Sequence, residues 1–147
     1  MPCRKLIGLL AAMAFFASMA FAAGEIEVRD RSGSYQGKIE ADGTVRDRSG
    51  SSVGRIESDG AVRDASGSSV GRVETDGTIR DRSGSSIGRV EKDGTMRDRS
   101  GSSVGRIEND GTVRDRSGSS VASLKPYLPD ARNKAAAYIF FFTSWLR

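Results

Sequence analysis

The acidic, basic and serine side chains of this chain recur at fixed spacing, and they are the groups that could do chemistry. In the segment Arg46–Val62, RDRSGSSVGRIESDGAV, the carboxylates Asp47, Glu57 and Asp59 alternate with three arginines. The whole sequence contains no His, which removes the commonest general base and the commonest transition-metal ligand. The repeated serines therefore lack a visible base that would activate them as nucleophiles.

The carboxylates fit neither a calcium site nor a pair of glycosidase acids. Ca²⁺ takes about six to eight oxygen ligands from converging groups, whereas Asp47 lies between two arginines and Asp59 adjoins Gly60. A glycoside hydrolase needs one differentiated pair of acids, yet Glu57 and Asp59 recur in equivalent copies. We therefore predict that the protein is not an enzyme, has no catalytic residue and uses no metal or cofactor.

The arginine that precedes each Asp is the candidate binding residue. Arg46 is expected to face Ser52 on the outer side of a sheet, and this pair recurs along the chain. Such an array could bind a repetitive anionic glycan, because many weak sites gain affinity together. Solvated arginines beside Glu and Asp are the alternative interpretation. The candidate residues are Arg46, Arg63, Arg80 and Arg97.

The formal net charge of +4 does not predict a nucleic-acid partner. Each copy of the repeat interleaves positive and negative side chains, so no cationic stripe forms. Without such a stripe, little counterion release from a phosphate backbone is available to drive binding.

All these side chains belong to a 17-residue repeat. A fixed period of this kind predicts a repeat architecture, in which one unit cannot bury its apolar face alone. The repeat region is expected to span residues 23–124. Its copies are Arg29–Val45, Arg46–Val62, Arg63–Ile79, Arg80–Met96 and Arg97–Val113, with a half copy at Arg114–Leu124.

Two glycine turns in each copy predict short β-hairpins. Asp-Gly pairs such as Asp59-Gly60 are strong hairpin signals. The second turn is Arg48-Ser49-Gly50, where the preceding Asp can accept a backbone hydrogen bond. If both loops hold three residues and end in a left-handed Gly, the register follows. The expected opposite pairs are Glu57 and Ala61, Ile56 and Val62, Asp47 and Ser51, and Val45 and Val53.

Val53 and Ile56 are three residues apart, so an ordinary strand would send them to opposite faces. A β-bulge at Gly54-Arg55 would absorb one residue and return both to one face. Bent hairpins with a common apolar side favour closure around a pseudo-symmetry axis, because closure removes exposed sheet edges. The predicted fold is therefore an all-β ring of five or six petals, with a linear β-solenoid as the alternative.

Three apolar positions in each copy are few for a stable core. The C-terminal segment 125–147 supplies additional apolar and aromatic side chains. Its stretch Ala131–Trp145, ARNKAAAYIFFFTSW, begins helix-like and becomes strongly apolar. We predict a plug that fills the open middle of the ring or covers one of its faces. A membrane or partner anchor is the alternative, since Trp and Tyr favour the membrane interface. Peripheral membrane contact would then involve Tyr138, Phe140, Phe141, Phe142 and Trp145.

Residues 1–22 predict a secretory signal peptide. Arg4 and Lys5 precede the apolar stretch Leu6–Phe21, and Ala20-Phe21-Ala22 provides a small-x-small cleavage site. The only cysteine, Cys3, would be removed with the peptide, so no disulfide is expected. The expected location is the periplasm, the cell envelope or the medium.

The motif V-x-D-x-x-G-x-x-V-G-x-I-x-x-D-G, from Val45 to Gly60, resembles the β-flower proteins of bacterial secretomes. The aromatic tail AAAYIFFF is similar to the tails of that family. The resemblance implies β-hairpin petals around a pseudo-symmetry axis and brings no catalytic residue with it. The chain departs from the pattern at Gln36, which replaces the Val53-type residue, and at Ala122, which replaces the bulge glycine.

Two functions of different classes follow. The first is an exported, non-enzymatic scaffold protein. The second is a multivalent binding module for an acidic glycan or an envelope partner.

Overall fold

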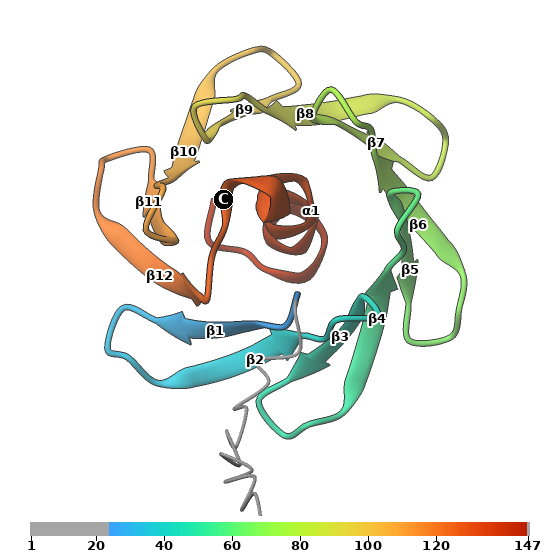
Figure 1. The fold of residues 1–147 in the computed structure, drawn as a ribbon. Coiled ribbons are helices and arrows are strands. Elements are labelled where there is room, and N and C mark those ends of the chain that lie inside the picture. The colour runs from blue at the N-terminus through green and yellow to red at the C-terminus, as the bar shows by residue number, and fades with distance from the viewer. Residues whose placement is uncertain (1–23, 147) are drawn as a thin grey trace, which may run out of the picture.

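The structure is a computed structural model that describes residues 24–146, which form a closed antiparallel ring of twelve strands around one helix (Figure 1). Neighbouring strands in the sequence pair with each other, and β12 pairs with β1 to close the ring. The closed all-β ring predicted from the repeat is confirmed. The strands are β1 (Ile26–Asp30), β2 (Tyr35–Ile39), β3 (Thr44–Asp47), β4 (Ser52–Ile56), β5 (Ala61–Asp64), β6 (Ser69–Val73), β7 (Thr78–Asp81), β8 (Ser86–Val90), β9 (Thr95–Asp98), β10 (Ser103–Ile107), β11 (Thr112–Asp115) and β12 (Ser120–Lys125).

Petal turns, the turns between an odd strand and the following even strand, project outward from the ring (Figure 1). In the turn after β3, the Asp47 N–H donates to the Ser51 carbonyl at 3.0 Å, and Gly50 has a φ of 86°. The Asp47 carboxylate accepts hydrogen bonds from the N–H groups of Ser49 at 2.8 Å and Ser51 at 3.0 Å. These contacts confirm the predicted three-residue loop and the pairing of Asp47 with Ser51.

Asp-Gly turns join each even strand to the next odd strand. Around Asp59-Gly60 the Glu57 N–H donates to the Ala61 carbonyl at 2.8 Å, and Ile56 lies opposite Val62, as predicted. The ring contains five such turns and six petal turns, because the half copy at its end supplies a sixth hairpin. The petal number that the sequence leaves between five and six is therefore six.

The β-bulge lies one residue earlier than predicted. In the pairing of β3 with β4, Arg46 lies opposite Ser52 and Val45 lies opposite Gly54, so Val53 is the extra residue. The predicted pairing of Val45 with Val53 is wrong. The physical reason is space, because a Cβ on Gly54 would lie 2.5 Å from the Phe142 ring and would also meet the Arg63 carbonyl oxygen. Only glycine fits this inward-facing position.

The core consists of two rows of apolar side chains that face the ring axis. Each odd strand contributes its second or third residue and each even strand its last or penultimate residue, and all of them are buried. Ladder partners meet as apolar pairs, as expected for stabilising cross-strand contacts. The rows are Val28, Val45, Val62, Ile79, Met96 and Val113, and Ile39, Ile56, Val73, Val90, Ile107 and Leu124.

The C-terminal segment fills the ring. After a short 3₁₀ helix, Pro129–Ala131, the helix α1, Arg132–Phe142, stands in the middle of the strands (Figure 1). Three consecutive alanines of α1 are fully buried, and such small side chains let the helix fit a narrow ring. Asn133 holds the start of the helix by donating to the Glu74 carbonyl at 3.1 Å. The predicted plug is confirmed.

None of the helices within residues 24–146 has the length and apolar character needed to cross a membrane. The predicted signal peptide, residues 1–22, lies outside the described residues.

Candidate functional site

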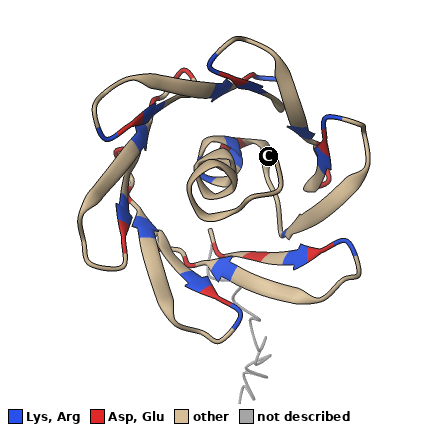
Figure 2. Ribbon diagram, turned by 180° about the vertical axis from the view of Figure 1, so that it is seen from behind, with Lys and Arg blue, Asp and Glu red and all other residues tan. Residues whose placement is uncertain are grey.

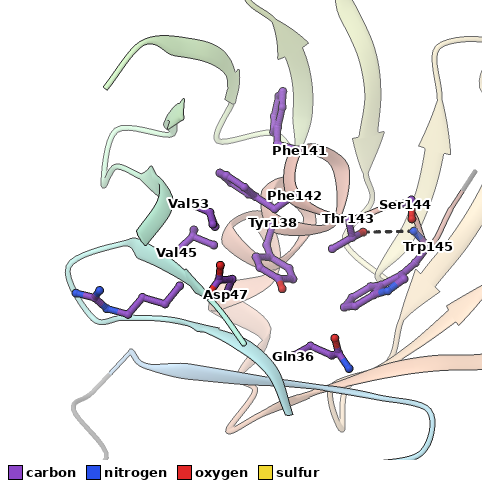
Figure 3. Close-up of a pocket in the computed structure, with 11 residues that line it drawn as sticks. Gln36, Val45, Asp47, Val53, Tyr138, Phe141, Phe142, Thr143, Ser144 and Trp145 are labelled. Atoms are coloured by element: carbon purple, nitrogen blue, oxygen red, sulfur yellow. Dashed lines mark hydrogen bonds between the residues drawn. The ribbon is translucent and has the colours of Figure 1, made fainter. Parts of the chain in front are cut away.

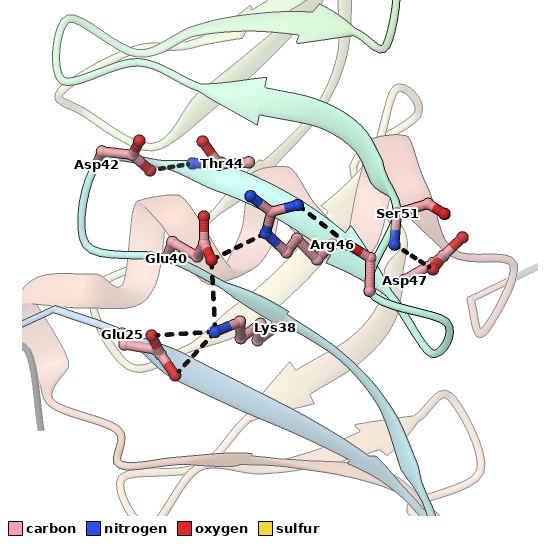
Figure 4. A network of polar contacts seen from close by, with 9 residues as sticks. Glu25, Lys38, Glu40, Asp42, Thr44, Arg46, Asp47 and Ser51 are labelled. Carbon is pink, nitrogen blue, oxygen red and sulfur yellow. Dashed lines mark hydrogen bonds and ion pairs between the residues drawn. The ribbon is translucent and has the colours of Figure 1, made fainter.

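The arginines predicted to bind a ligand are bonded within the ring, each to a carbonyl of its own petal turn and to a Glu of the preceding Asp-Gly turn. Arg46 donates from Nε to Glu40 Oε1 at 2.8 Å and from Nη1 to the Gly50 carbonyl at 3.0 Å (Figure 4). It lies opposite Ser52, as predicted. The same arrangement recurs at the other candidates, whose Nε–Oε1 distances are 3.0 Å for Arg63–Glu57, 2.8 Å for Arg80–Glu74 and 2.9 Å for Arg97–Glu91.

The ion pair between Arg46 and Glu40 favours the charged form of both partners. The hydrogen bond that Arg46 donates to Glu40 raises the pKa of Arg46 and lowers the pKa of Glu40. Glu40 also lies 3.3 Å from Lys38 Nζ, which in turn contacts Glu25 (Figure 4). These partly exposed contacts connect the two sides of an Asp-Gly turn. Their immediate effect is therefore to stabilise the hairpin of β2 and β3.

The four candidate arginines are distributed one to a petal and do not converge on one point. Arg114 is a fifth member that the sequence analysis missed, since it pairs with Glu108 at 2.8 Å and lies opposite Ser120. The signal was present in the sequence, because a Glu precedes each such Arg by six residues across an Asp-Gly turn.

A second row of arginines was also missed, and it lies directly across from the first. Arg55 is exposed and faces Arg63 across the ladder. Like charges in this position oppose each other, and the neighbouring carboxylates offset the repulsion, so that basic and acidic residues adjoin around the ring (Figure 2). The remaining cross-strand pairs are Arg72 with Arg80, Arg89 with Arg97 and Arg106 with Arg114.

The aspartates of the petal turns act as turn residues. The side-chain hydrogen bond from Ser49 is the main reason that the pKa of Asp47 is lowered, and backbone N–H groups add to the effect. Within residues 24–146, no group of three or more His, Cys, Asp or Glu residues could hold a metal ion.

The tail residues that follow the buried part of α1 fit into the positions left open by the bulge glycines. The ring of Phe142 lies against Gly54, Phe141 against Gly71 and Phe140 against Gly88, and Leu146 lies against Gly105. Consecutive residues of the tail thus contact consecutive petals. We call these four places the filled sectors.

The sector of the first petal is different, because a cleft of about 620 Å³ opens there between β2, β3 and the tail. Its wall includes Gln36, Asp47, Tyr138 and Trp145 (Figure 3). Trp145 packs beside Tyr138 with the ring centroids 6.1 Å apart and the planes at 57°. We call this place the open sector. In this cleft Gln36, which departs from the repeat, lies together with residues of the tail.

The five aromatic residues predicted to contact a membrane all lie in or beside this interior packing. Tyr138 is buried, and the other four are partly buried against the core. Peripheral membrane contact stays a prediction. It would require five aromatic side chains to leave the interior of the strand ring: Tyr138, Phe140, Phe141, Phe142 and Trp145.

Comparison with known proteins gives one family. The family model described as 5-fold beta-flower protein matches residues 25–143. No curated protein and no solved structure gives a significant match. The number in the family description equals the number of Asp-Gly turns in this chain.

Proposed function

We propose, from the premise that this chain belongs to the 5-fold beta-flower protein family, that it is a non-enzymatic scaffold protein exported to the periplasm, the cell envelope or the medium. The observation that carries the proposal is the internal use of the repeated polar groups. Each petal-turn Asp, from Asp30 to Asp115, accepts hydrogen bonds from its own turn. Arg46 and its equivalents bond to a Glu and a carbonyl of their own hairpins.

Equivalent groups repeated around an axis also argue against catalysis. A catalytic centre needs groups of unlike pKa that converge on one reacting atom. Here the same Arg–Glu pair and the same Asp turn recur in successive petals, and each copy is separated from the next by a strand pair. The repeated groups therefore support the ring.

Export is tested by following the N-terminus of the chain in its natural host. We expect mass spectrometry of the protein from the periplasm or the medium to find a chain that begins at Ala23. A variant with Leu9→Arg, which interrupts the apolar stretch, should stay inside the cell with its N-terminus intact. A full-length N-terminus on the wild-type protein in the cytosol would contradict the proposal.

The scaffold role is tested by deleting residues 131–147 and repeating the fractionation. We expect the full-length protein to remain soluble and the truncated chain to unfold or to be degraded, because the ring loses its central packing. If the full-length protein sediments with membrane and the truncated chain is soluble and folded, the segment is an anchor and the membrane alternative replaces the plug.

A second candidate function is binding of an acidic glycan by the outer face, and the two facing rows of arginines favour it. No ion pair within residues 24–146 involves Arg55, Arg72 or Arg106, and all three side chains are exposed. Fixed, repeated cations could bind regularly spaced carboxylates through multivalency. The partner would be an acidic polysaccharide of the envelope.

Polygalacturonate is a suitable probe for this function, with dextran as the neutral control. We expect saturable binding that weakens as salt rises, because exposed charges are screened. Alanine replacement of Arg55, Arg72, Arg89 and Arg106 should abolish it. The same replacement of Arg46, Arg63, Arg80 and Arg97 is the matched comparison for the predicted candidates, with circular dichroism to check the fold. Equal retention of both polymers would remove this function.

A further inference from the structure

We propose that the open sector is a single binding site for a neutral pyranose unit of a glycan, contacted by Trp145, Tyr138 and Gln36. This site is distinct from the outer face, since Tyr138 is buried and the cleft is bounded by the helix and the first two petals. The inference does not depend on the charge of the outer arginines. It rests on where the chain abandons its repeat.

One departure from the repeat, Gln36, meets the tail at the open sector. In the first petal, Tyr35 and Gln36 stand where the second petal has Ser52 and Val53. Gln36 lines the cleft, and the tail adds Trp145, the only Trp of the chain. A ring that needed only to be stable could have kept the repeat here. Instead, an amide replaces an apolar side chain at the wall of a cavity.

Gln36 is held in a fixed position. Its Nε2 donates to Asp30 Oδ2 at 2.6 Å, and its Oε1 accepts from Arg48 Nη2 at 3.4 Å. An amide has a second N–H and a second lone pair, so Gln36 keeps one donor and one acceptor for a ligand. A polar group that is already oriented loses little entropy when it binds.

Tyr138 supplies the second polar group. Only 6% of its surface is exposed, and its hydroxyl has no hydrogen-bond partner among the described residues. Burial raises its pKa to about 12, so the hydroxyl remains protonated and can donate. Figure 3 shows this hydroxyl directed away from the helix, on the side of the labelled Gln36 and Trp145. The Tyr138 hydroxyl is not among the buried polar atoms without a partner, so it is accessible and can donate to a ligand hydroxyl in the cleft.

The aromatic surface suits a sugar ring. The face of Trp145 carries a negative quadrupole, which attracts the polarised C–H groups on the face of a pyranose, whereas the Tyr138 ring is stacked on Phe142 and contributes its hydroxyl. The cleft volume of about 620 Å³ falls within the range of roughly 300–1,000 Å³ that is typical of small-molecule sites. Asp47 and Arg46 both border the cleft. Their opposite charges offset each other, which favours a neutral ligand over an anion.

Trp145 makes the site directly observable, because emission excited at the indole band comes from this residue alone. The full chain is titrated with cellotriose and with chitotriose as neutral probes, and with tri-galacturonate as the charged probe. We expect a saturable change in Trp145 emission with at least one neutral probe, unchanged when the salt concentration is raised. No change with either neutral probe, or a change with tri-galacturonate alone, would overturn the proposal.

A matched pair of variants identifies the residues. Gln36→Val restores the residue that the second petal has, and it should weaken binding about tenfold through loss of the oriented amide. Ile87→Val changes the equivalent residue in a filled sector and should leave the affinity unchanged. Tyr138→Phe should weaken binding by a similar factor while Trp145 still reports. Equal affinity of wild type, Gln36→Val and Tyr138→Phe would assign the signal to a site other than this cleft.

Discussion

The filled sectors and the open sector are built from the same repeat, and they differ only in what the tail and the first petal place there. In a filled sector, an aromatic or leucine side chain of the tail lies on the bulge glycine, as Phe141 does on Gly71. In the open sector, the tail presents Tyr138 and Trp145 beside a petal that carries Gln36. A tail side chain covers the bulge glycine in the first case, and the cleft lined by Gln36, Tyr138 and Trp145 lies in the second.

The comparison shows that the residues that build the repeated petals differ from the residues that make one sector unlike the others. The repeated glycines, aspartates and arginines recur because every petal needs the same bulge, turn and ion pair. A differentiated site requires residues that occur once, and these come from the first petal and the tail. The following predictions test whether the two kinds of sector differ in energy as the packing implies.

The largest effect is expected for Gly71→Ala. A Cβ at this position would lie 2.6 Å from Phe141 Cε1 and would meet the Arg80 carbonyl oxygen, so the petal and the tail must separate. We expect a loss of about 3 kcal/mol in the free energy of unfolding, measured by urea denaturation.

Gly67→Ala is the control for this change. Gly67 has a φ of 86°, and a Cβ added there would meet no atom within 4 Å. Only backbone strain of about 1 kcal/mol is therefore expected. Equal losses for the two variants would show that the contact with Phe141 does not determine the choice of glycine.

Removal of the aromatic rings compares the two sectors directly. Phe140→Ala should cost about 2 to 3 kcal/mol, because it leaves the filled sector at Gly88 without its packing partner. Trp145→Ala should cost about 1 kcal/mol, since Trp145 borders an existing cleft. Thermal unfolding followed by circular dichroism measures both variants without using tryptophan emission. A larger loss for Trp145→Ala would reverse the assignment of filled and open sectors.

Alkaline pH should destabilise the protein through Tyr138. Its pKa is raised by burial to about 12 from an ordinary value of 10.0, so the folded state retains a proton that the unfolded state releases. The stabilisation is complete below pH 10 and is lost as the pH rises through 12, by up to about 3 kcal/mol. Tyr138→Phe should remove this part of the pH dependence. An identical alkaline decline in the variant would place its origin elsewhere.

The smallest loss of stability is expected for replacements on the outer face. The ion pairs of this face are alike in the filled and open sectors. Arg46 borders the open sector and Arg80 belongs to a filled one, yet both hold a Glu at 2.8 Å. Alanine replacement of either should lower the free energy of unfolding only slightly, as is usual for partly exposed ion pairs. A clearly larger loss for Arg46→Ala, measured by urea denaturation, would show that the outer ion pairs also support the cleft.

Much of the fold could be predicted because the same 17-residue pattern of turn and apolar residues occurs several times in the sequence. Asp59-Gly60 and Arg48-Ser49-Gly50 specify turns through local backbone chemistry, and the pairing of Ile56 with Val62 follows from the loop length alone. The aromatic content of the tail, set against a small repeat core, was enough to predict the plug. These features depend on short-range geometry or on composition.

The bulge and the cleft could not be predicted in the same way. The position of the bulge at Val53 reflects the contact of Gly54 with Phe142, two residues far apart in the sequence. Gln36 stood out as a departure from the repeat, but nothing in the sequence placed it beside Tyr138 and Trp145.

The sequence by itself determined the petals, their turns, the alternation of apolar and charged faces, and the need for a central plug. The physical reason is that turns and ladders depend on residues that are close together in the sequence. Each copy of the repeat has the same residue types at those positions. Only the tertiary structure decided which petals the tail would fill, where the glycine had to lie, and where the cleft would open. Those features arise when a single asymmetric helix is placed inside a nearly symmetric ring, because one helix cannot contact six equivalent petals in the same way.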